Sequence, residues 1–400
     1  MALIIPLLKA VKSPSDMASF RPISLTSCFV KVIERMYAER IYHLAEKNEW
    51  IADIQAGFRK GHSCTDQIIR VCQGIEDGFQ QKPTFHRSVL VLLDYSKAYD
   101  TVWRERLLLS MADKGVPLRA IRWIHGFLRN RQARVRLNGE TSKSKNFKQG
   151  LPQGAVLSPL LFMFFINNLA ESLPNPDTQQ LTSAKLIYSM FADDCTILAS
   201  HAKREKANEA AQLIVDMVVK WSNEWKLTLN ATKSEVCFFS TWVQEATWQP
   251  AIRIDGRKIP FNPTPRLLGV YLDRQLTFNK HIEEVFKSAA SKMKTIGAVS
   301  NSKWGWCKES LKKVYQMFVK SKMDYAAPAW QPWLSETGEK ALDRVQNKAL
   351  RLVTGQLKTT PTEALRYETR TEHYSTYTRR TCLKSVEMAK RLPDSHLKSP

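Results

Sequence analysis

The stretch Leu186-Ile187-Tyr188-Ser189-Met190-Phe191-Ala192-Asp193-Asp194-Cys195-Thr196-Ile197-Leu198-Ala199 holds two apolar, β-prone runs separated by a pair of aspartates. The pattern predicts a β-hairpin whose tip carries Asp193 and Asp194. Two adjacent carboxylates repel each other and raise each other's pKa, and a hard divalent cation with its preference for oxygen ligands removes this conflict. Aspartate is also a common turn residue, so the pair alone is equally compatible with an ordinary polar turn.

A further carboxylate follows a strand upstream. Val89-Leu90-Val91-Leu92-Leu93 has the pattern of a short buried strand, and it ends directly on Asp94. Three carboxylates at the ends of neighbouring strands can hold two metal ions roughly 3.5–4 Å apart, as in polymerases and nucleases. The three carboxylates together favour a metal site for in-line phosphoryl transfer over the interpretation of Asp193 and Asp194 as an ordinary polar turn.

Longer segments extend this pattern in a defined order. Leu93–Val102, Gly150–Pro159 and Phe191–Asp194 resemble the first catalytic, nucleotide-pocket and second catalytic segments of the reverse transcriptase domain of non-LTR (LINE-type, jockey-like) retrotransposons. Four flanking segments resemble the same family: Arg21-Pro22-Ile23-Ser24-Leu25, Gln55-Ala56-Gly57-Phe58-Arg59, Leu229-Asn230-Ala231-Thr232-Lys233-Ser234 and Leu268-Gly269-Val270-Tyr271-Leu272-Asp273. Any one segment would be a weak signal, but seven in the family's order, over about residues 4 to 285, make a strong one.

The resemblance implies an α+β fold of the right-hand polymerase type, with fingers, a palm built on an antiparallel sheet, and a helical thumb. Compared with the family, the chain is N-terminally truncated and begins partway into the fingers. The expected divisions are partial fingers at 1–88, the palm with its catalytic carboxylates at 89–245, a primer-holding hairpin and the thumb at 246–355, and a polar linker opening a truncated C-terminal region at 356–400.

Local patterns predict individual elements. Ala133–Leu137 alternates up to an Asn138-Gly139 turn, which is a strong hairpin signal. Apolar residues recur at helical spacing in 203–225, so we expect Trp221 to pack in the core rather than to form a stacking platform. Helices are further expected at about 29–48, 65–80, 102–114, 118–128, 159–169, 281–299, 308–323 and 336–354, with a short hairpin at 266–280.

The resemblance gives catalytic and metal-binding roles to Asp94, Asp193 and Asp194. It implies two Mg²⁺ ions, for which Mn²⁺ could substitute, one acting on the primer 3′-hydroxyl and the other on the triphosphate and the departing pyrophosphate. Asp100 stands six residues after Asp94. We expect it to lie beyond the strand end and to have a structural role, such as capping the helix that begins near Val102.

Five residues receive nucleotide-binding roles from the same resemblance. Tyr99 corresponds to the aromatic position under the incoming sugar, where a ring would clash with a 2′-hydroxyl; a buried aromatic in a strand-to-helix turn fits the sequence too, and both could hold. Gln153 and Gly154 resemble the loop that contacts the nascent base pair. Arg59 is expected to bind the triphosphate from the fingers. Lys233 is expected to protonate pyrophosphate as a general acid, although a solvated surface lysine is a nearly equal alternative.

The charge of the chain points to a polyanionic partner. Among its 400 residues, 60 lysines and arginines outnumber 38 aspartates and glutamates, which gives a net charge of +22. Residues 119–148 hold nine basic side chains against one acid, Glu140, and residues 281–400 hold 22 basic and 12 acidic residues. Such lopsided segments indicate contact with phosphates, although a solvated basic face is the plainer alternative.

The sequence therefore predicts an RNA-directed DNA polymerase whose partners are an RNA template, a DNA primer and dNTPs, with no small-molecule cofactor and no membrane. The longest apolar run, Leu160–Ile166, is too short to span a bilayer. The seven scattered cysteines suit an intracellular protein with reduced thiols, in the nucleus or cytoplasm as a ribonucleoprotein. Two alternatives stay open: a catalytically decayed nucleic-acid-binding relic, and a group II intron-type maturase.

Overall fold

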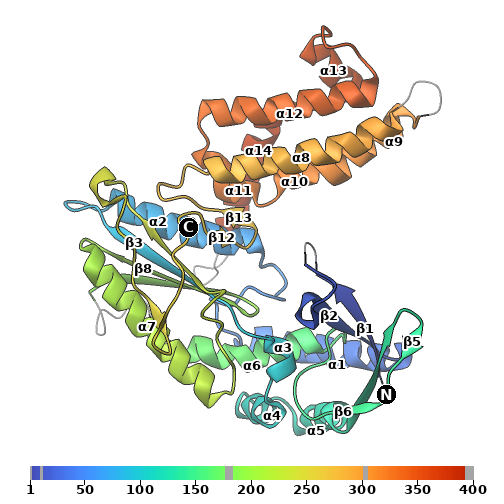
Figure 1. Cartoon of the computed structure of the whole chain (residues 1–400), viewed down its shortest axis with the longest axis vertical. Helices are drawn as coiled ribbons and strands as arrows, with labels where there is room; N and C mark the ends of the chain where they lie inside the picture. Colours follow the sequence, from blue (N-terminus) through green and yellow to red (C-terminus); the bar gives the residue numbers. More distant parts are fainter. Residues whose placement is uncertain (1, 10–11, 176–182, 301–304, 392–400) are drawn as a thin grey trace.

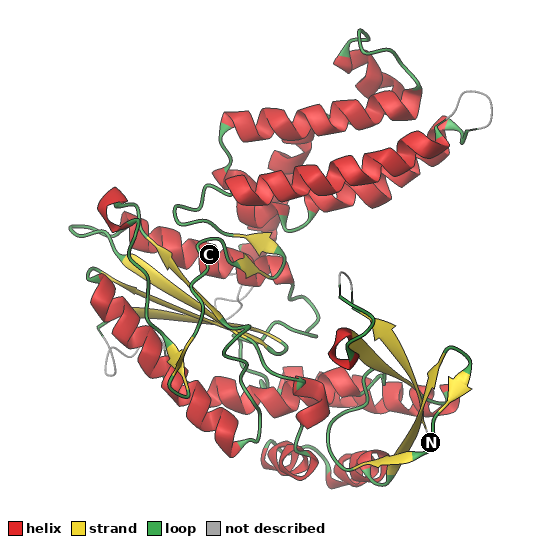
Figure 2. Cartoon of the chain, viewed as in Figure 1, coloured by secondary structure: helices red, strands yellow, loops and turns green. Residues whose placement is uncertain are grey.

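The computed structural model describes residues 2–9, 12–175, 183–300 and 305–391. The chain forms two main sheets, whose strands alternate along the sequence, and a bundle of helices that follows them (Figure 1). Figure 2 shows that strands build the N-terminal and central parts, whereas the chain beyond residue 279 is helical. The fold is mixed α and β, as the sequence predicts.

A four-stranded antiparallel sheet lies at the centre of the molecule, in the order β7-β8-β3-β9. Its strands are β3 (Arg87–Leu93), β7 (Lys185–Phe191), β8 (Asp194–His201) and β9 (Glu235–Phe239). Helix α7 (Arg204–Glu224) shares a core with Val89 and Val91, while α2 (Cys64–Gln80) shares another with Leu90. Because successive side chains of a strand point to opposite faces, helices on both faces explain why β3 is apolar throughout.

A second sheet lies in the N-terminal part, with the strand order β2-β1-β4-β5 and β6 paired to β4. Its strands are β1 (Ala2–Leu8), β2 (Phe20–Leu25), β4 (Arg131–Leu137), β5 (Glu140–Thr141) and β6 (Lys145–Phe147). The expected hairpin is confirmed, with positive φ angles of 50° at Asn138 and 89° at Gly139. However, β4 pairs in parallel with β1. Residues 131–147 therefore belong to the N-terminal sheet, although the sequence-based division at residue 89 places them in the central part.

Apart from the short α3, the helices around these two sheets lie where the sequence predicts them. Trp221 is buried and stacks on Trp225 at 5.3 Å, so its expected core role is confirmed. The remaining helices of this half are α1 (Cys28–Lys47), α3 (Ala98–Thr101), α4 (Arg104–Asp113), α5 (Leu118–Leu128) and α6 (Ser158–Ser172).

Two small hairpins lead from the central sheet into the C-terminal helices. Their strands are β10 (Arg253–Ile254), β11 (Arg257–Lys258), β12 (Arg266–Leu267) and β13 (Val270–Tyr271). The helices that follow are α8 (Asn279–Val299), α9 (Lys308–Val314), α10 (Ser321–Asp324), α11 (Ala327–Trp330), α12 (Glu336–Thr354), α13 (Thr362–Thr369) and α14 (Tyr374–Ala389). A wider helical turn at Tyr315–Lys320 joins α9 to α10.

The interpretation of residues 356–400 as a polar linker is wrong for the described part of that segment. Helices α13 and α14 form there, and Leu365 and Tyr374 are buried in the same core as α8 and α12. The Tyr374 hydroxyl donates to an Asp324 carboxylate oxygen at 3.2 Å and accepts from Gln331 Nε2 at 3.1 Å. The segment reads as polar because few of its side chains face the core, and these few anchor it.

No helix in the described ranges combines the length and the apolar character that crossing a membrane requires. All seven cysteines lie in those ranges as free thiols, as the sequence predicts.

Candidate active site

The aspartate pair lies at the tip of the predicted hairpin. Phe191 of β7 pairs with Asp194 of β8, so Ala192 and Asp193 form a two-residue turn. Ala192 has a φ of +58°, in the left-handed region. This conformation costs a residue other than glycine roughly 1–2 kcal/mol, so neighbouring groups must hold it in place. The turn brings Asp193 to the end of the sheet beside the first residue of β8.

Asp94 reaches the same end of the sheet from the adjacent strand. Leu93, the last residue of β3, pairs with Cys195, which places Asp94 next to the hairpin tip. The loop that contains Lys233 secures the backbone of Asp94: Asn230 N donates to Asp94 O at 2.8 Å, and Asp94 N donates to Ser234 Oγ at 3.1 Å. The structure thus brings Asp94, Asp193 and Asp194 together, as predicted.

The three carboxylates influence one another's ionisation. Burial raises the pKa of Asp194 to about 6, and the charges of Asp193 and Asp94 add to this effect. Burial also raises the pKa of Asp193, with a further contribution from Asp94, against its own backbone N–H and the charge of Arg21. For Asp94, burial raises the pKa, while Lys233 and Lys9 oppose the shift. Removing three carboxylates from water at one sheet end is unfavourable without a compensating cation.

The donor chemistry of this cluster suits a hard divalent cation. Asp94 Oδ2 is buried and has no hydrogen-bond partner in the described ranges. Lys233 Nζ lies 3.8 Å from it, close enough for an ion pair but too far for a hydrogen bond. Within the same ranges no three acidic, histidine or cysteine side chains are arranged as a finished metal cage. The residues fit Mg²⁺ or Mn²⁺ by their oxygen donors and by a buried carboxylate oxygen that has no hydrogen-bond partner in the described ranges.

Tyr99 lies in α3, close to the carboxylates. Its ring stacks on Phe162 of α6, with centroids 4.4 Å apart and an angle of 11° between the planes. Burial raises the pKa of the Tyr99 hydroxyl, and the charge of Asp193 adds to the shift, which confirms that the two side chains are near each other. Tyr99 O accepts a 2.7 Å hydrogen bond from Leu151 N, so the backbone of Tyr99 is held while Phe162 supports its ring.

Gln153 and Gly154 lie between the Tyr99 region and the N-terminal sheet. Gly154 has a φ of +100°, and a side chain there would approach Ile23 Cγ2 and Ser24 O at 3.2 Å. Ser24 N donates to Gln153 O at 2.6 Å, while Gln153 Nε2 donates to Asp100 Oδ1 at 3.0 Å. The helix-capping role expected of Asp100 is therefore wrong, because Asp100 lies within α3 and orients Gln153 instead.

The guanidinium of Arg59 is buried against acceptors of the protein itself. Its side chain is only 8% exposed, and its Nε and Nη2 donate to the two carboxylate oxygens of Glu46 at 3.1 and 2.8 Å. Nη1 donates to the carbonyls of Ala52 and Gln55. A guanidinium with these partners stabilises its own loop, and the assignment of Arg59 to the triphosphate stays a prediction. Lys233 does reach the site and is 65% exposed.

Two basic residues beside the carboxylates have no role in the sequence-based assignment. The charge of Arg21 acts on Asp193, and that of Lys9 acts on Asp94 and Asp100. Both come from the β1–β2 hairpin region, where Arg21 pairs with Leu7 across the strands. The motif Arg21-Pro22-Ile23-Ser24-Leu25 draws attention to Arg21 in the sequence. The direction of the Arg21 side chain, however, depends on how its strand pairs.

Arg104 is a further residue that sequence reasoning misses. It is a buried arginine whose guanidinium donates to four backbone carbonyls, those of Gly150, Leu128, Phe147 and Gln149, at 2.8 to 2.9 Å. It thereby fixes the entry to the Gln153 loop. A single arginine in a helical pattern carries no sequence signal for such a role.

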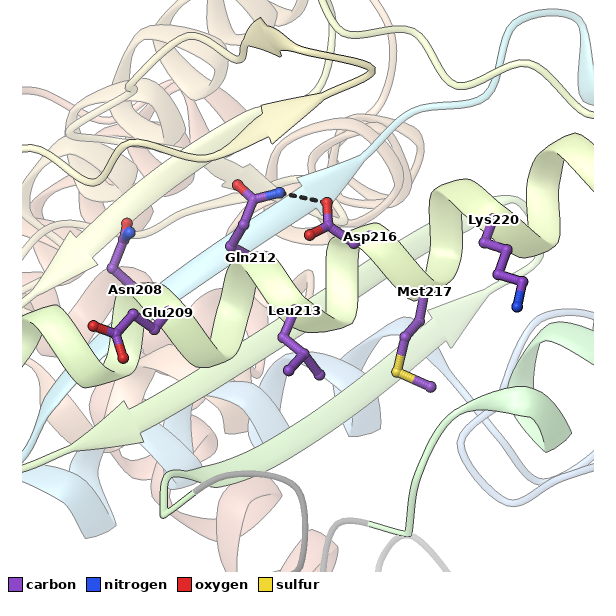
Figure 3. A pocket seen from close by; sticks show the side chains of 7 residues that line it. All are labelled: Asn208, Glu209, Gln212, Leu213, Asp216, Met217 and Lys220. Atoms are coloured by element: carbon purple, nitrogen blue, oxygen red, sulfur yellow. Dashed lines mark hydrogen bonds between the residues drawn. The ribbon is translucent and has the colours of Figure 1, made fainter.

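A shallow depression of about 550 Å³ lies along the outer side of α7, away from these groups (Figure 3). Its polar lining comes from one helix, and Gln212 Nε2 donates to Asp216 Oδ1 at 2.7 Å. It contains none of the candidate site residues and has the composition of a solvated helix face.

Comparison with known proteins identifies similar chains. The family model described as reverse transcriptase (RNA-dependent DNA polymerase) matches residues 11–297. Two similar Drosophila melanogaster proteins are the probable RNA-directed DNA polymerase from transposon X-element, 28% identical over 348 residues, and the RNA-directed DNA polymerase from mobile element jockey, 28% identical over 315 residues. The matches cover 87% and 78% of this chain but 37% and 33% of those proteins, so the chain spans about a third of their length.

Among solved structures, apo telomerase from Candida tropicalis is similar with a TM-score of 0.47 and 10% identity, over 88% of this chain and 60% of that one.

Proposed function

Because the chain belongs to the reverse transcriptase family, we propose that it catalyses RNA-directed DNA synthesis by transferring nucleotides from dNTPs to a primer 3′-hydroxyl. The observation that supports this most directly is the meeting of Asp94, Asp193 and Asp194 at one sheet end, where a buried oxygen of Asp94 has no hydrogen-bond partner in the described ranges. The central sheet would be the palm, the N-terminal sheet part of the fingers, and the helices after residue 279 the thumb.

In this proposal the carboxylates of Asp94 and Asp193 are the principal ligands of two Mg²⁺ or Mn²⁺ ions, with Asp194 in support. When bound, the ions would lower the pKa of the 3′-hydroxyl and neutralise charge on the triphosphate. Tyr99 would lie under the sugar, and the Gln153-Gly154 loop would contact the new base pair. Lys233 would supply the proton to the leaving pyrophosphate.

Primer extension on poly(rA)/oligo(dT) with Mg²⁺ and dTTP tests this function. Extension that stops when EDTA is added is expected. Binding to primer–template without extension would instead indicate the non-catalytic relic. The names of the similar Drosophila proteins, which come from transposons and mobile elements, do not favour an intron maturase.

Arg21, not Arg59, is the residue that we propose for triphosphate binding. Replacing Arg21 with Gln is expected to raise the KM for dTTP about tenfold, because a charge-assisted hydrogen bond to phosphate contributes roughly 1.5–3 kcal/mol. Replacing Arg59 with Gln is expected to lower the free energy of unfolding while leaving the KM of the folded protein unchanged. Steady-state kinetics and thermal melts distinguish the two, and the reverse result would restore Arg59 to the site.

We further propose that RNA lies across one face of the N-terminal sheet. Leu7 pairs with Arg21 and Leu3 with Arg134, and residues 3 and 7 of a strand point to the same face. Arg134 and Arg136 are both exposed. They lie two residues apart on β4, so their side chains point to the same face of the sheet as Arg21. A row of guanidinium groups suits a phosphate backbone.

Duplex binding should therefore weaken steeply with salt. Each phosphate contact contributes a slope of about −0.9 to log K against log salt, so Arg134→Gln with Arg136→Gln is expected to reduce the slope by about two. Arg204→Gln with Lys206→Gln, on α7 and paired with Glu205 and Glu209, serves as the control that removes the same number of charges. Anisotropy titrations measure both, and equal slopes in the double variant and the parent would remove these arginines from the interface.

A further inference from the structure

The hairpin tip that carries Asp193 is held by a side chain from a distant part of the chain. Gln55 is fully buried, and its Oε1 accepts hydrogen bonds from Ala192 N at 2.9 Å and from Gly57 N at 2.8 Å. Its Nε2 donates to Ala192 O at 3.3 Å. One amide group thus pairs with both backbone groups of Ala192.

The backbone around Gln55 lies against the same strand. Ala56 N donates to Met190 O at 2.9 Å, and Met190 N donates to Ile54 O at 2.9 Å. Gln55 and Met190 form a parallel bridge at the end of β7. The segment before Gly57 therefore acts as a short additional strand at the edge of the central sheet.

Gly57 allows this close approach. A Cβ at position 57 would lie 2.3 Å from Ala192 N and 3.0 Å from Ala192 Cα, both of which are backbone atoms. Real contacts of that length are excluded, so any larger residue would push the tip away. The turn at Ala192 therefore needs both the amide of Gln55, which binds its backbone, and the missing side chain of Gly57, which leaves space for it.

We propose that Gln55 is a positioning residue that keeps Ala192 in its left-handed conformation and so sets where the Asp193 carboxylate lies for metal binding and nucleotidyl transfer. The inference rests on the proposed function. An alanine leaves the left-handed region when nothing holds it there, and the next residue in the chain is Asp193. Groups that orient metal ligands affect affinity and rate although they never touch the substrate.

Gln67 offers a matched control for general loss of packing. It is also fully buried, and it contacts the same strand, accepting a hydrogen bond from Ser189 Oγ and donating to Ile54 O. It does not contact Ala192 in any of its hydrogen bonds described here. Gln55→Met and Gln67→Met remove the same amide from comparable surroundings, so they should lose stability alike but differ in their effect on Asp193.

The test measures Mn²⁺ binding to the protein by electron paramagnetic resonance, together with primer-extension kinetics and thermal melts. Gln55→Met is expected to weaken Mn²⁺ binding and to lower kcat, each about tenfold, with KM for primer–template within about twofold of the parent. Gln67→Met is expected to stay within about twofold of the parent in Mn²⁺ affinity, kcat and KM. Equal Mn²⁺ affinity and kcat in the two folded variants would overturn the proposal.

A glycine pair keeps the proposal testable if Gln55→Met does not fold. Gly57→Ala should displace the tip and weaken Mn²⁺ binding, whereas Gly126→Ala, with open space at its Cβ in α5, should not. Unchanged Mn²⁺ affinity in folded Gly57→Ala would contradict the inference. If the parent binds Mn²⁺ but does not extend primers, the proposed polymerase function is overturned. The Mn²⁺ affinities of the variants then still test the role of Gln55. A parent that binds no more Mn²⁺ than Asp193→Asn overturns both.

Discussion

Replacing Asp193 or Asp94 with Asn is expected to lower dTTP incorporation by on the order of a thousandfold or more, because the metal-supported charge stabilisation that depends on them amounts to several kcal/mol. The amide keeps the shape of the side chain but loses the charge. Burial raises the pKa of both carboxyl groups, so the neutral variants should fold at least as well as the parent. Primer extension under single-turnover conditions measures the loss.

The control for this prediction is Asp100→Asn. Asp100 is half-buried and contacts Gln153 Nε2 rather than the carboxylate cluster, so its loss should reduce the rate far less. Anisotropy should show primer–template binding by the Asp193 variant close to that of the parent. Incorporation by Asp94→Asn or Asp193→Asn at nearly the parental rate would remove these residues from the metal site.

Tyr99→Val is expected to shift the preference for dTTP over UTP by on the order of a hundredfold toward UTP, because the smaller side chain leaves space for a 2′-hydroxyl. A clash of this kind raises the cost of the wrong substrate without improving binding of the right one. Phe162 supports the ring from behind at 4.4 Å, so the ring cannot retreat to admit the hydroxyl. Competing incorporation of dTTP and UTP measures the ratio.

Tyr99→Phe is the matched control, since it keeps the ring and removes only the hydroxyl, and its ratio should stay near that of the parent. If Tyr99 served packing alone, truncation to Ala would cost roughly 3–5 kcal/mol of stability, and both substrates would suffer alike. An unchanged ratio in a folded and active Tyr99→Val protein would exclude the role in sugar selection.

The motifs predicted the family correctly. The match to the reverse transcriptase family over residues 11–297 confirms the resemblance read from seven short segments. The position of the aspartates was also predictable, because a strand ending at Asp94 and a hairpin turning at Asp193 are local patterns. Neighbouring strand ends then bring carboxylates together by sheet geometry alone.

The roles of Arg59 and Asp100 were not predictable in the same way. A Gly-Phe-Arg motif shows where an arginine lies in the chain but not which acceptor its guanidinium binds. In the structure that acceptor is Glu46 on α1. Asp100 has the spacing of a helix cap, yet its carboxylate oxygen accepts a hydrogen bond from Gln153, in a loop 53 residues away. Side-chain partners so distant in sequence depend on how whole elements pack.

The sequence by itself determined the longer helices up to residue 354, the central hairpin and the carboxylate set, because periodicity and turn chemistry act over a few residues. Only the tertiary structure decided that residues 131–147 extend the N-terminal sheet, that α13 and α14 pack onto the helical bundle, and that Gln55 holds the tip of the hairpin. Each of these depends on a contact between segments far apart in the chain. A buried backbone group requires a partner, and folding decides which of many polar side chains supplies it.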